Sequence, residues 1–235
     1  MRFRAITLFL SVFILATQSV IAQQSLKNDK EMRAAIARVE SASEVFDEVM
    51  DIKDRSIPEE ILEKAHAIVV FPGTLKGAFI FGGQRGKGVA VRKIGRNWSA
   101  PAFVNLGGGS VGFQIGGQKI DYVLVIMNEE GLKGLLEDKF EMGGEASVAA
   151  GPIGRTTAAS TNATLDAAIL SYSKTQGAFA GVSLKGAVIK QDKSINRAVY
   201  GKSAKDLLIR DQALWTSAPE DLQEFPRTVR KYIRR

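Results

Sequence analysis

The chain contains no cysteine, and His66 is its only histidine. Without cysteine it cannot form a disulfide, a thiolate nucleophile, an iron–sulfur cluster or a cysteine-ligated zinc site. A single histidine leaves no partner for a metal site built on a histidine pair, and it argues against a Ser-His-Asp relay. Most enzyme classes that are recognisable from sequence are therefore absent, and we expect no cofactor and no resident metal ion.

Long apolar runs are scarce as well. The chain has 235 residues, of which 45% are hydrophobic and 24% are charged, and its formal net charge is +7. This composition excludes a collagen, a low-complexity tail and a polytopic membrane protein. The length suits one domain with helical additions, large enough to bury a substantial core.

The first residues have the layout of a secretory signal. Arg2 and Arg4 form a basic start, Ala5–Ala16 is apolar and uncharged, and Val20–Ala22 offers small or β-branched residues for cleavage. An uncleaved anchor helix is the alternative, but 12 residues at about 1.5 Å each fall short of a roughly 30 Å hydrocarbon core. We predict cleavage after about Ala22 and a periplasmic or secreted protein, including a membrane-associated form.

The charge of the remaining chain is unevenly distributed. Residues 23–63 carry 6 basic and 11 acidic side chains, whereas residues 64–119 carry 8 basic and no acidic ones. A basic block among glycines is typical of a surface that binds an anionic partner, although a merely solvated surface can have the same composition. Export argues against nucleic acid, so we favour a membrane surface of anionic lipids as the partner.

Two kinds of periodicity divide the chain. Residues 26–55 have helical spacing of apolar residues opposite a charged face, and the acidity of this region favours packing on a core over membrane insertion. Ser56–Glu59 resembles a capping box that starts a short helix to about Ala65. Helices resume after Asp192 at 192–199 and 203–210 and in a final segment.

Between these helical regions the pattern is that of short strands at close spacing, which predicts an antiparallel barrel or sandwich. The many glycines favour sharply bent barrel strands, although the pattern alone does not separate the two architectures. A helix is expected at 129–138. The expected strands are 67–71, 77–81, 88–94, 102–106, 110–116, 122–127, 146–150, 169–173 and 178–190.

Three glycine-containing segments invite functional interpretations. Gly107–Gly112 matches the dinucleotide motif, but a strand pattern follows it where a helix would be needed. Gly82–Lys87 is better explained as a glycine hairpin that exposes Arg85 and Lys87 than as a phosphate loop. Gly151–Ala168 has few large apolar residues and predicts an exposed, mobile loop that carries Arg155.

Three ordered stretches resemble the SYLF-domain family of lipid-binding proteins. They are Ala65–Gly88, Trp98–Asn128 with its Trp-Ser-Ala-Pro opening and glycine cluster, and Gly144–Gly186 with the segments SVAAGPIGR and SYSKTQGAFAGVSLKG. The resemblance is collinear over roughly Glu59–Tyr200. It implies an α+β fold with an antiparallel β-barrel core, helices packed on its surface and mobile loops. It also implies a bacterial, exported member that binds phosphoinositides or other anionic phospholipids weakly, without catalysis.

Some eukaryotic relatives in that family bind actin and carry an SH3 or FYVE module. No such module fits in this chain and an exported protein would not meet cytosolic actin, so we expect no actin partner. The alternative function is an interaction or structural role in the cell envelope with a protein partner and no lipid specificity. A small-molecule carrier is a weaker hypothesis that needs a hollow barrel.

The sequence thus predicts four segments, namely a signal peptide at 1–22, an amphipathic helical segment at 23–57, a SYLF-like β-barrel domain at 58–210 and a basic helical segment at 211–235. Because the N-terminal helix is acidic, we place the lipid contact on the basic part of the barrel and on the C-terminal segment. The predicted lipid-binding residues are Lys76, Arg85, Lys87, Arg92, Lys93, Arg96, Arg155, Arg230 and Lys231.

Overall fold

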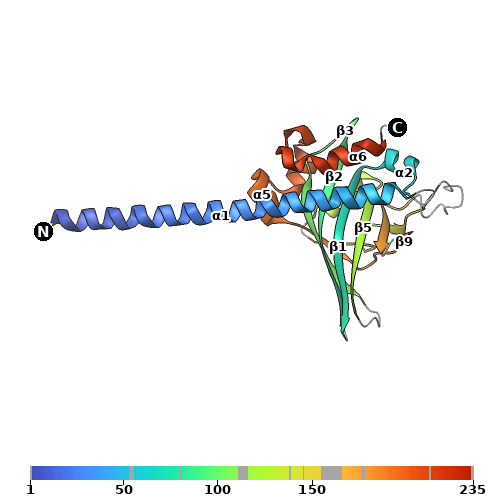
Figure 1. Ribbon diagram of the computed structural model, residues 1–235, viewed down its shortest axis with the longest axis horizontal. Coiled ribbons are helices and arrows are strands. Elements are labelled where there is room, and N and C mark those ends of the chain that lie inside the picture. Colours follow the sequence, from blue (N-terminus) through green and yellow to red (C-terminus); the bar gives the residue numbers. More distant parts are fainter. Residues whose placement is uncertain are drawn as a thin grey trace.

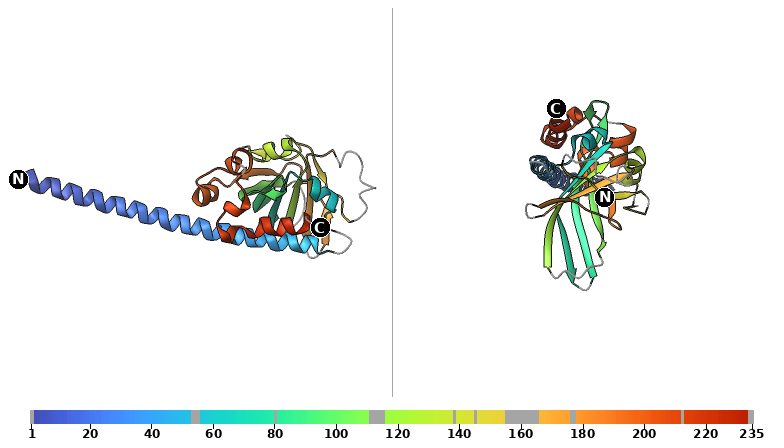
Figure 2. Two further views of the ribbon diagram at one scale, coloured as in Figure 1. Left: turned by 90° about the horizontal axis from the view of Figure 1, so that it is seen from above. Right: turned by 90° about the vertical axis from the view of Figure 1, so that its right-hand side faces the viewer.

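The computed structural model describes residues 2–52, 56–79, 81–110, 116–137, 139–144, 146–154, 166–175, 178–211 and 213–233. One curled sheet forms its centre, with helices against both faces (Figures 1 and 2). The predicted α+β fold with an antiparallel barrel core is confirmed, in the form of a half-barrel. Its strands are β1 Ala67–Phe79, β2 Phe81–Ile94, β3 Asn97–Trp98, β4 Ala102–Ser110, β5 Gly116–Ile126, β6 Phe140–Glu141, β7 Val148–Ala150, β8 Ile169–Thr175, β9 Ala178–Gly181 and β10 Val188–Gln191.

The sheet has the strand order β6-β10-β4-β2-β1-β5-β8-β7, while β3 pairs with β2 and β9 with β8. All of these pairs are antiparallel except β7–β8. The helical elements are α1 Arg2–Met50, α2 Glu59–Lys64, α3 Glu129–Leu135, α5 Lys193–Tyr200, the π-helical η2 Asp206–Arg210, the 3-10 turns η3 Trp215–Ser217 and η4 Glu220–Leu222, and α6 Glu224–Ile233.

The central strands are apolar on both faces, and each face has its own cover. In β1, Ile68 and Val70 face one core cluster and Val69 and Phe71 the other. Helices α1, α2, α5 and α6 contribute to the first cluster, which we call the outer core, whereas α3 and η2 contribute to the second, the inner core. Figure 2 shows α1 and α6 on one side of the sheet and α3 on the other.

Helix α1 crosses the sheet and continues away from the domain at its N-terminal end (Figure 1). Its predicted apolar stripe packs on the outer core, with Val39, Phe46 and Val49 completely buried. This confirms the interpretation of residues 26–55 as a helix that packs on a core, as far as the described residues extend. Among those residues, no helix has an apolar run long enough to cross a membrane. Cleavage after about Ala22 stays a prediction.

A buried ion pair fastens α1 to the domain. Arg38 Nη2 lies 2.8 Å from Asp192 Oδ2, and the two side chains are only 10% and 11% exposed. Asp192 also caps α5, because its Oδ1 accepts a hydrogen bond from the Ile195 amide. Breaking such a pair would leave a charge buried without compensation, so the pair fixes where α1 crosses the sheet.

Several local predictions from the sequence are wrong. Residues 77–81 are not a separate strand, because Phe79 pairs with Phe81 and the segment joins the ends of β1 and β2. Gly82–Lys87 is not a hairpin, because these residues pair regularly with β4 inside β2, although Arg85 and Lys87 are exposed as expected. Residues 178–190 form two strands, since Gly186 turns the chain with a φ of +79°.

Two other local expectations also need correction. The short helix after Ser56 is present, but it begins at Glu59 behind Pro58, and no side chain caps it. The segment 151–168 is not exposed at its ends, where Gly151, Ala167 and Ala168 are buried. A Cβ on Gly151 would meet the Tyr172 ring at 2.0 Å, so this glycine is held against the sheet. The expected strand centre at 111–115 and Arg155 lie outside the described residues.

A β-bulge in β1 reverses its side-chain alternation. Phe71 pairs with Tyr122 and Thr74 with Ile120, so β1 contains one residue more than β5 between these pairs. Gly73 supplies the required left-handed backbone with a φ of +54°, and its amide donates to Asp121 Oδ1 at 2.7 Å. Beyond this bulge, β1, β2, β4 and β5 extend past α1 as a projecting sheet (Figure 1).

A substitution of Gly88 can test how tightly β2 packs on β1. An added Cβ would meet Phe71 Cδ1 at 2.4 Å and the Val70 carbonyl oxygen at 2.8 Å. We expect Gly88→Ala to lower the free energy of unfolding by about 1–3 kcal/mol, measured by urea denaturation, because the backbone oxygen cannot give way cheaply.

Gly107→Ala is the matched control, since nothing lies within 4 Å of an added Cβ there. It should leave the free energy of unfolding unchanged or raise it by up to about 1 kcal/mol. Equal effects of the two substitutions would show that the close approach at Gly88 is not a packing constraint.

Candidate functional site

The predicted cations do not form one patch. Arg85 and Lys87 lie on the projecting sheet, whereas Lys93, Arg96 and Arg230 line a groove formed by α2, the β2–β3 turn and α6. Lys87 and Lys93 are six residues apart on one strand, which places the two groups about 20 Å from each other. The structure therefore offers two candidate anion-binding surfaces.

The first surface, the basic face, consists of Arg85, Lys87, Lys119 and Lys190. All four side chains are exposed. In β2, Arg85 and Lys87 share the side of Val89 and Val91, which face the outer core, because β2 pairs with β4 without interruption. The basic face therefore continues the side that α1 covers, beyond the point where the helix cover ends (Figure 1).

Strand register brings the other two lysines to the same side. Leu75 of β1 pairs with both Arg85 and Lys119, so these three residues form one row across the sheet. Asn105 of β4 pairs with both Lys87 and Lys190, which forms a second row. Directly opposite residues of antiparallel strands point to the same face. Neighbouring cations are thus separated by about 7–10 Å.

The bulge decides what else lies on this face. It turns Leu75 toward the cations, where the side chain is 56% exposed, and it turns Lys76 to the opposite face in a row with Gln84 and Gln118. Within the described part of the chain, no ion pair or side-chain hydrogen bond links any of the four cations to another residue. Two carboxylates share this side, Asp121 two residues from Lys119 and Glu141 at the end of the Arg85 row, so the face keeps a net charge of +2, which favours an anionic partner.

Arg92 and Lys231 hold structural elements together. Arg92 donates from Nη1 to the Leu208 carbonyl at 2.9 Å and pairs through Nη2 with Glu129 at 3.1 Å, with a side chain only 15% exposed. Lys231 Nζ lies 3.1 Å from Asp47 Oδ1 and so joins α6 to α1. These contacts account for both cations without a ligand.

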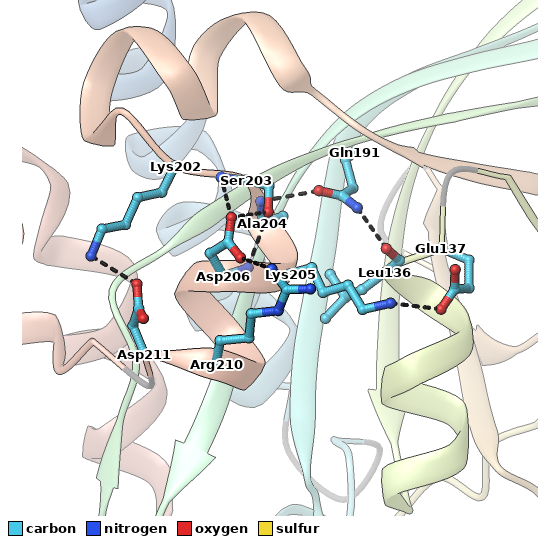
Figure 3. Close-up of polar contacts among 10 residues, drawn as sticks. All are labelled: Leu136, Glu137, Gln191, Lys202, Ser203, Ala204, Lys205, Asp206, Arg210 and Asp211. Atoms are coloured by element: carbon cyan, nitrogen blue, oxygen red, sulfur yellow. Dashed lines mark hydrogen bonds and ion pairs between the residues drawn. The ribbon is translucent and has the colours of Figure 1, made fainter.

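The segment around η2 is also basic, but its cations are paired (Figure 3). Lys202 pairs with Asp211, Lys205 with Glu137 and Arg210 with Asp206. The side-chain amide of Gln191 bridges the Leu136 carbonyl and the Ala204 amide beside them. The number of cations in a segment therefore does not identify a free basic surface.

The second surface is a groove of about 390 Å³. Lys93 donates from Nζ to the Glu63 carbonyl at 2.5 Å, and Arg96 is exposed in the turn that Gly95 makes with a φ of +58°. Arg230 lies over the Trp215 ring at 5.9 Å, and its Nε is buried without a hydrogen-bond partner. The groove is lined by Glu63, Lys93, Gly95, Arg96, Trp98, Arg230 and Ile233.

Sequence reasoning missed Lys119, Lys190 and Leu75 as members of the basic face. Lys119 lies in the acid-free block, but its position opposite Leu75 depends on the bulge, and Lys190 is about a hundred residues from Lys87 in the chain. Only the register of five strands brings them together. A pairing diagram drawn through Gly73 would have identified them.

The described residues offer no obvious catalytic or metal centre. Over the described ranges, no group of three or more histidine, aspartate or glutamate side chains could hold a metal ion. His66 Nδ1 lies 3.8 Å from Glu129 Oε2, where both side chains are partly exposed. The absence of enzymatic activity stays a prediction.

Comparison with known proteins places these surfaces in context. A family model named Ysc84, described as Las17-binding protein actin regulator, matches residues 107–232. Protein YSC84 of Saccharomyces cerevisiae is 32% identical over 191 residues, which cover 79% of this chain and 40% of the relative. LAS seventeen-binding protein 3 of the same species has the same identity and coverage. The SH3 domain-containing YSC84-like protein 1 of Homo sapiens is 31% identical over 176 residues, with coverages of 73% and 51%.

These comparisons overturn one expectation. The chain spans about two fifths to one half of the length of these relatives. Their names describe binding or regulatory proteins, and the matching family is named for actin regulation. The expectation that actin has no part is therefore wrong, because it rested on the predicted export and on the lack of an added module, and the similarity extends through the chain's own core.

The junction between α1 and α6, which positions Arg230, can be tested at Tyr232. Its hydroxyl donates to Asp47 Oδ1 at 2.6 Å. Burial is the main cause that raises the pKa of Tyr232 to about 12, and the hydrogen bond to the Asp47 carboxylate raises it further. Because the folded-state pKa lies above the unfolded one, this contribution to stability is complete below about pH 10 and is lost as the pH rises through 12.

We expect Tyr232→Phe to lower the free energy of unfolding by about 1.5–3 kcal/mol at pH 7, because a hydrogen bond to a charged group is lost. The variant should also lack the part of the alkaline loss of stability that Tyr232 causes. Urea unfolding between pH 7 and 11 measures both effects. A wild-type stability at pH 7, or an unchanged alkaline slope, would contradict this account of the junction.

Proposed function

The chain belongs to the Ysc84 family, and on that premise we propose that it is a non-catalytic module that binds anionic phospholipid headgroups weakly through its basic face. The resemblance to the SYLF-domain family is confirmed by the family match and the relatives, whereas the bacterial and exported character of the chain stays a prediction. The observation that carries the proposal is the gathering of four exposed, unpaired cations on one uncovered side of the sheet.

Charge and shape both support a lipid surface as the partner. A cation near an anionic membrane contributes about 1 kcal/mol, so four cations contribute about 4 kcal/mol and a roughly millimolar affinity. Leu75, at 56% exposure in the middle of the row, offers apolar area that can enter the headgroup layer. The binding is therefore weak, sensitive to salt and dependent on the anionic lipid content.

Vesicle flotation of the chain from Gln23 onward tests the proposal. Omitting residues 1–22 is necessary because the apolar run Ala5–Ala16 would bind lipid by itself. We expect flotation with vesicles that contain phosphatidylglycerol, none with phosphatidylcholine alone, and loss of flotation near 0.5 M salt, where screening acts within about 4 Å. The triple variant Arg85→Glu, Lys87→Glu, Lys119→Glu should not float with any vesicle.

The matched control reverses Lys133, Lys139 and Lys185, which are also exposed but lie on or near elements of the inner core. Both triple variants change the net charge equally, so only the position of the charge differs. Flotation of the control variant and not of the test variant supports the basic face. Equal flotation of the two variants would overturn it, provided that both have wild-type circular dichroism.

The description of the matching family model, Las17-binding protein actin regulator, favours a second candidate function, regulation of actin through a protein partner. The similarity to the two yeast proteins covers 79% of this chain. Co-sedimentation with actin filaments tests whether the chain itself binds actin. We expect pelleting with filaments that the basic-face variant reduces, because a filament surface is acidic; pelleting no greater than without filaments would remove this candidate.

A further inference from the structure

The groove between α2, the β2–β3 turn and α6 is distinct from the basic face, and we propose that it is a binding site for a phosphate monoester. This inference does not depend on the basic face, which lies on another part of the domain. The ligand chemistry is that of a terminal phosphate group, carried either by a soluble molecule or by a lipid headgroup.

The charges around the groove match such a ligand. Three cations, Lys93, Arg96 and Arg230, face one carboxylate, that of Glu63, which leaves a net charge of +2. A phosphate monoester carries a charge of about −1.5 to −2 at neutral pH. The Lys93 ammonium is held by the backbone carbonyl of residue 63 and not by the carboxylate, so its charge is not neutralised by this contact.

Arg230 is positioned before any ligand arrives. Its guanidinium lies over the Trp215 ring, and Arg227 lies over the same ring at 5.4 Å. The Nε of Arg230 is buried without a partner. A planar guanidinium held in this way presents its remaining donors in a fixed fork, which suits the oxygens of a phosphate.

The size and lining of the groove favour a small phosphorylated molecule. A volume of about 390 Å³ lies in the range of small-ligand sites. Ile233 provides an apolar contact for the carbon part of the ligand, and Trp98, which is 2% exposed, supports the groove from beneath. The alternative explanation is that Arg230 only balances the carbonyls at the C-terminal end of α6, in the way that basic residues commonly do.

The chain contains two tryptophans, Trp98 and Trp215, and both contact this region. Intrinsic tryptophan fluorescence is therefore a direct readout of the groove. Titration of the chain from Gln23 onward, as used for flotation, with glycerol 3-phosphate should give a saturable change that sodium chloride at equal ionic strength does not produce. A second titration with phosphatidylcholine vesicles that contain phosphatidic acid presents the same phosphate monoester on a lipid.

Arg230→Gln should weaken binding at least about tenfold, since a hydrogen bond from a charged group to the phosphate is lost. Arg227→Gln is the matched control, because it removes the same charge from the same helix and the same ring without altering the groove lining. The triple variant of the basic face should keep its response to glycerol 3-phosphate, which separates this inference from the proposed function.

Each outcome is decisive. A response to glycerol 3-phosphate that Arg230→Gln loses and Arg227→Gln keeps supports a site for soluble phosphate monoesters. A response of the same pattern only to phosphatidic acid vesicles supports the site and assigns its phosphate to a lipid. No response to either probe, or equal losses in the two glutamine variants, overturns the proposal and leaves Arg230 as a residue that stabilises the end of α6.

Discussion

The central strands are apolar on both faces, and most of the architecture follows from the need to cover both. Val89 and Val91 of β2 require α1 and α6 on one side, whereas Val69 and Phe71 of β1 require α3 and η2 on the other. Farther out than the basic face, glycine takes the place of large side chains in the four strands of the projecting sheet. Gly117, Gly77, Gly83 and Gly109 then form a row across β5, β1, β2 and β4.

The bulge at Gly73 separates the part of β1 that packs in the two cores from the part that carries the basic face. On the core side of Gly73, successive side chains of β1 pack alternately into the outer and the inner core. On the projecting side, the shifted alternation sets Leu75 among cations and sends Lys76 to the other face. A single extra residue thus determines which side of the sheet is basic and which side chain lies at its centre.

The sequence predicted what depends on local periodicity. The stripe of Val39, Phe46 and Val49 recurs with helical spacing, and it packs where an amphipathic helix must. Alternation also predicted the core part of most strands. The sequence could not predict the bulge, because alternation is visible in one strand whereas register is a property of two. Hence the sequence alone predicts a hairpin at Gly82–Lys87, whereas these residues pair along β4.

The candidate sites were predictable only as a list of cations. Arg85, Arg92 and Arg96 all belong to one acid-free block, yet the first is free, the second is held by Glu129 and Leu208, and the third lines a groove. What separates them is the presence of a partner distant in the chain. The groove joins residues near 63, 93–98 and 230–233, so no sequence window contains it.

The contacts of α1 with α6 join the start and the end of the domain, so they form late in synthesis. Phe46 packs edge-on against Phe225 and Tyr232, about 180 residues later in the chain. At a synthesis rate of roughly 5–20 residues per second, the apolar stripe of α1 waits about 10–40 s for the helix that completes its cover. During that interval the newly made segment presents Val39, Phe46 and Val49 to its surroundings. The cover of α1 is therefore incomplete until α6 has been synthesised.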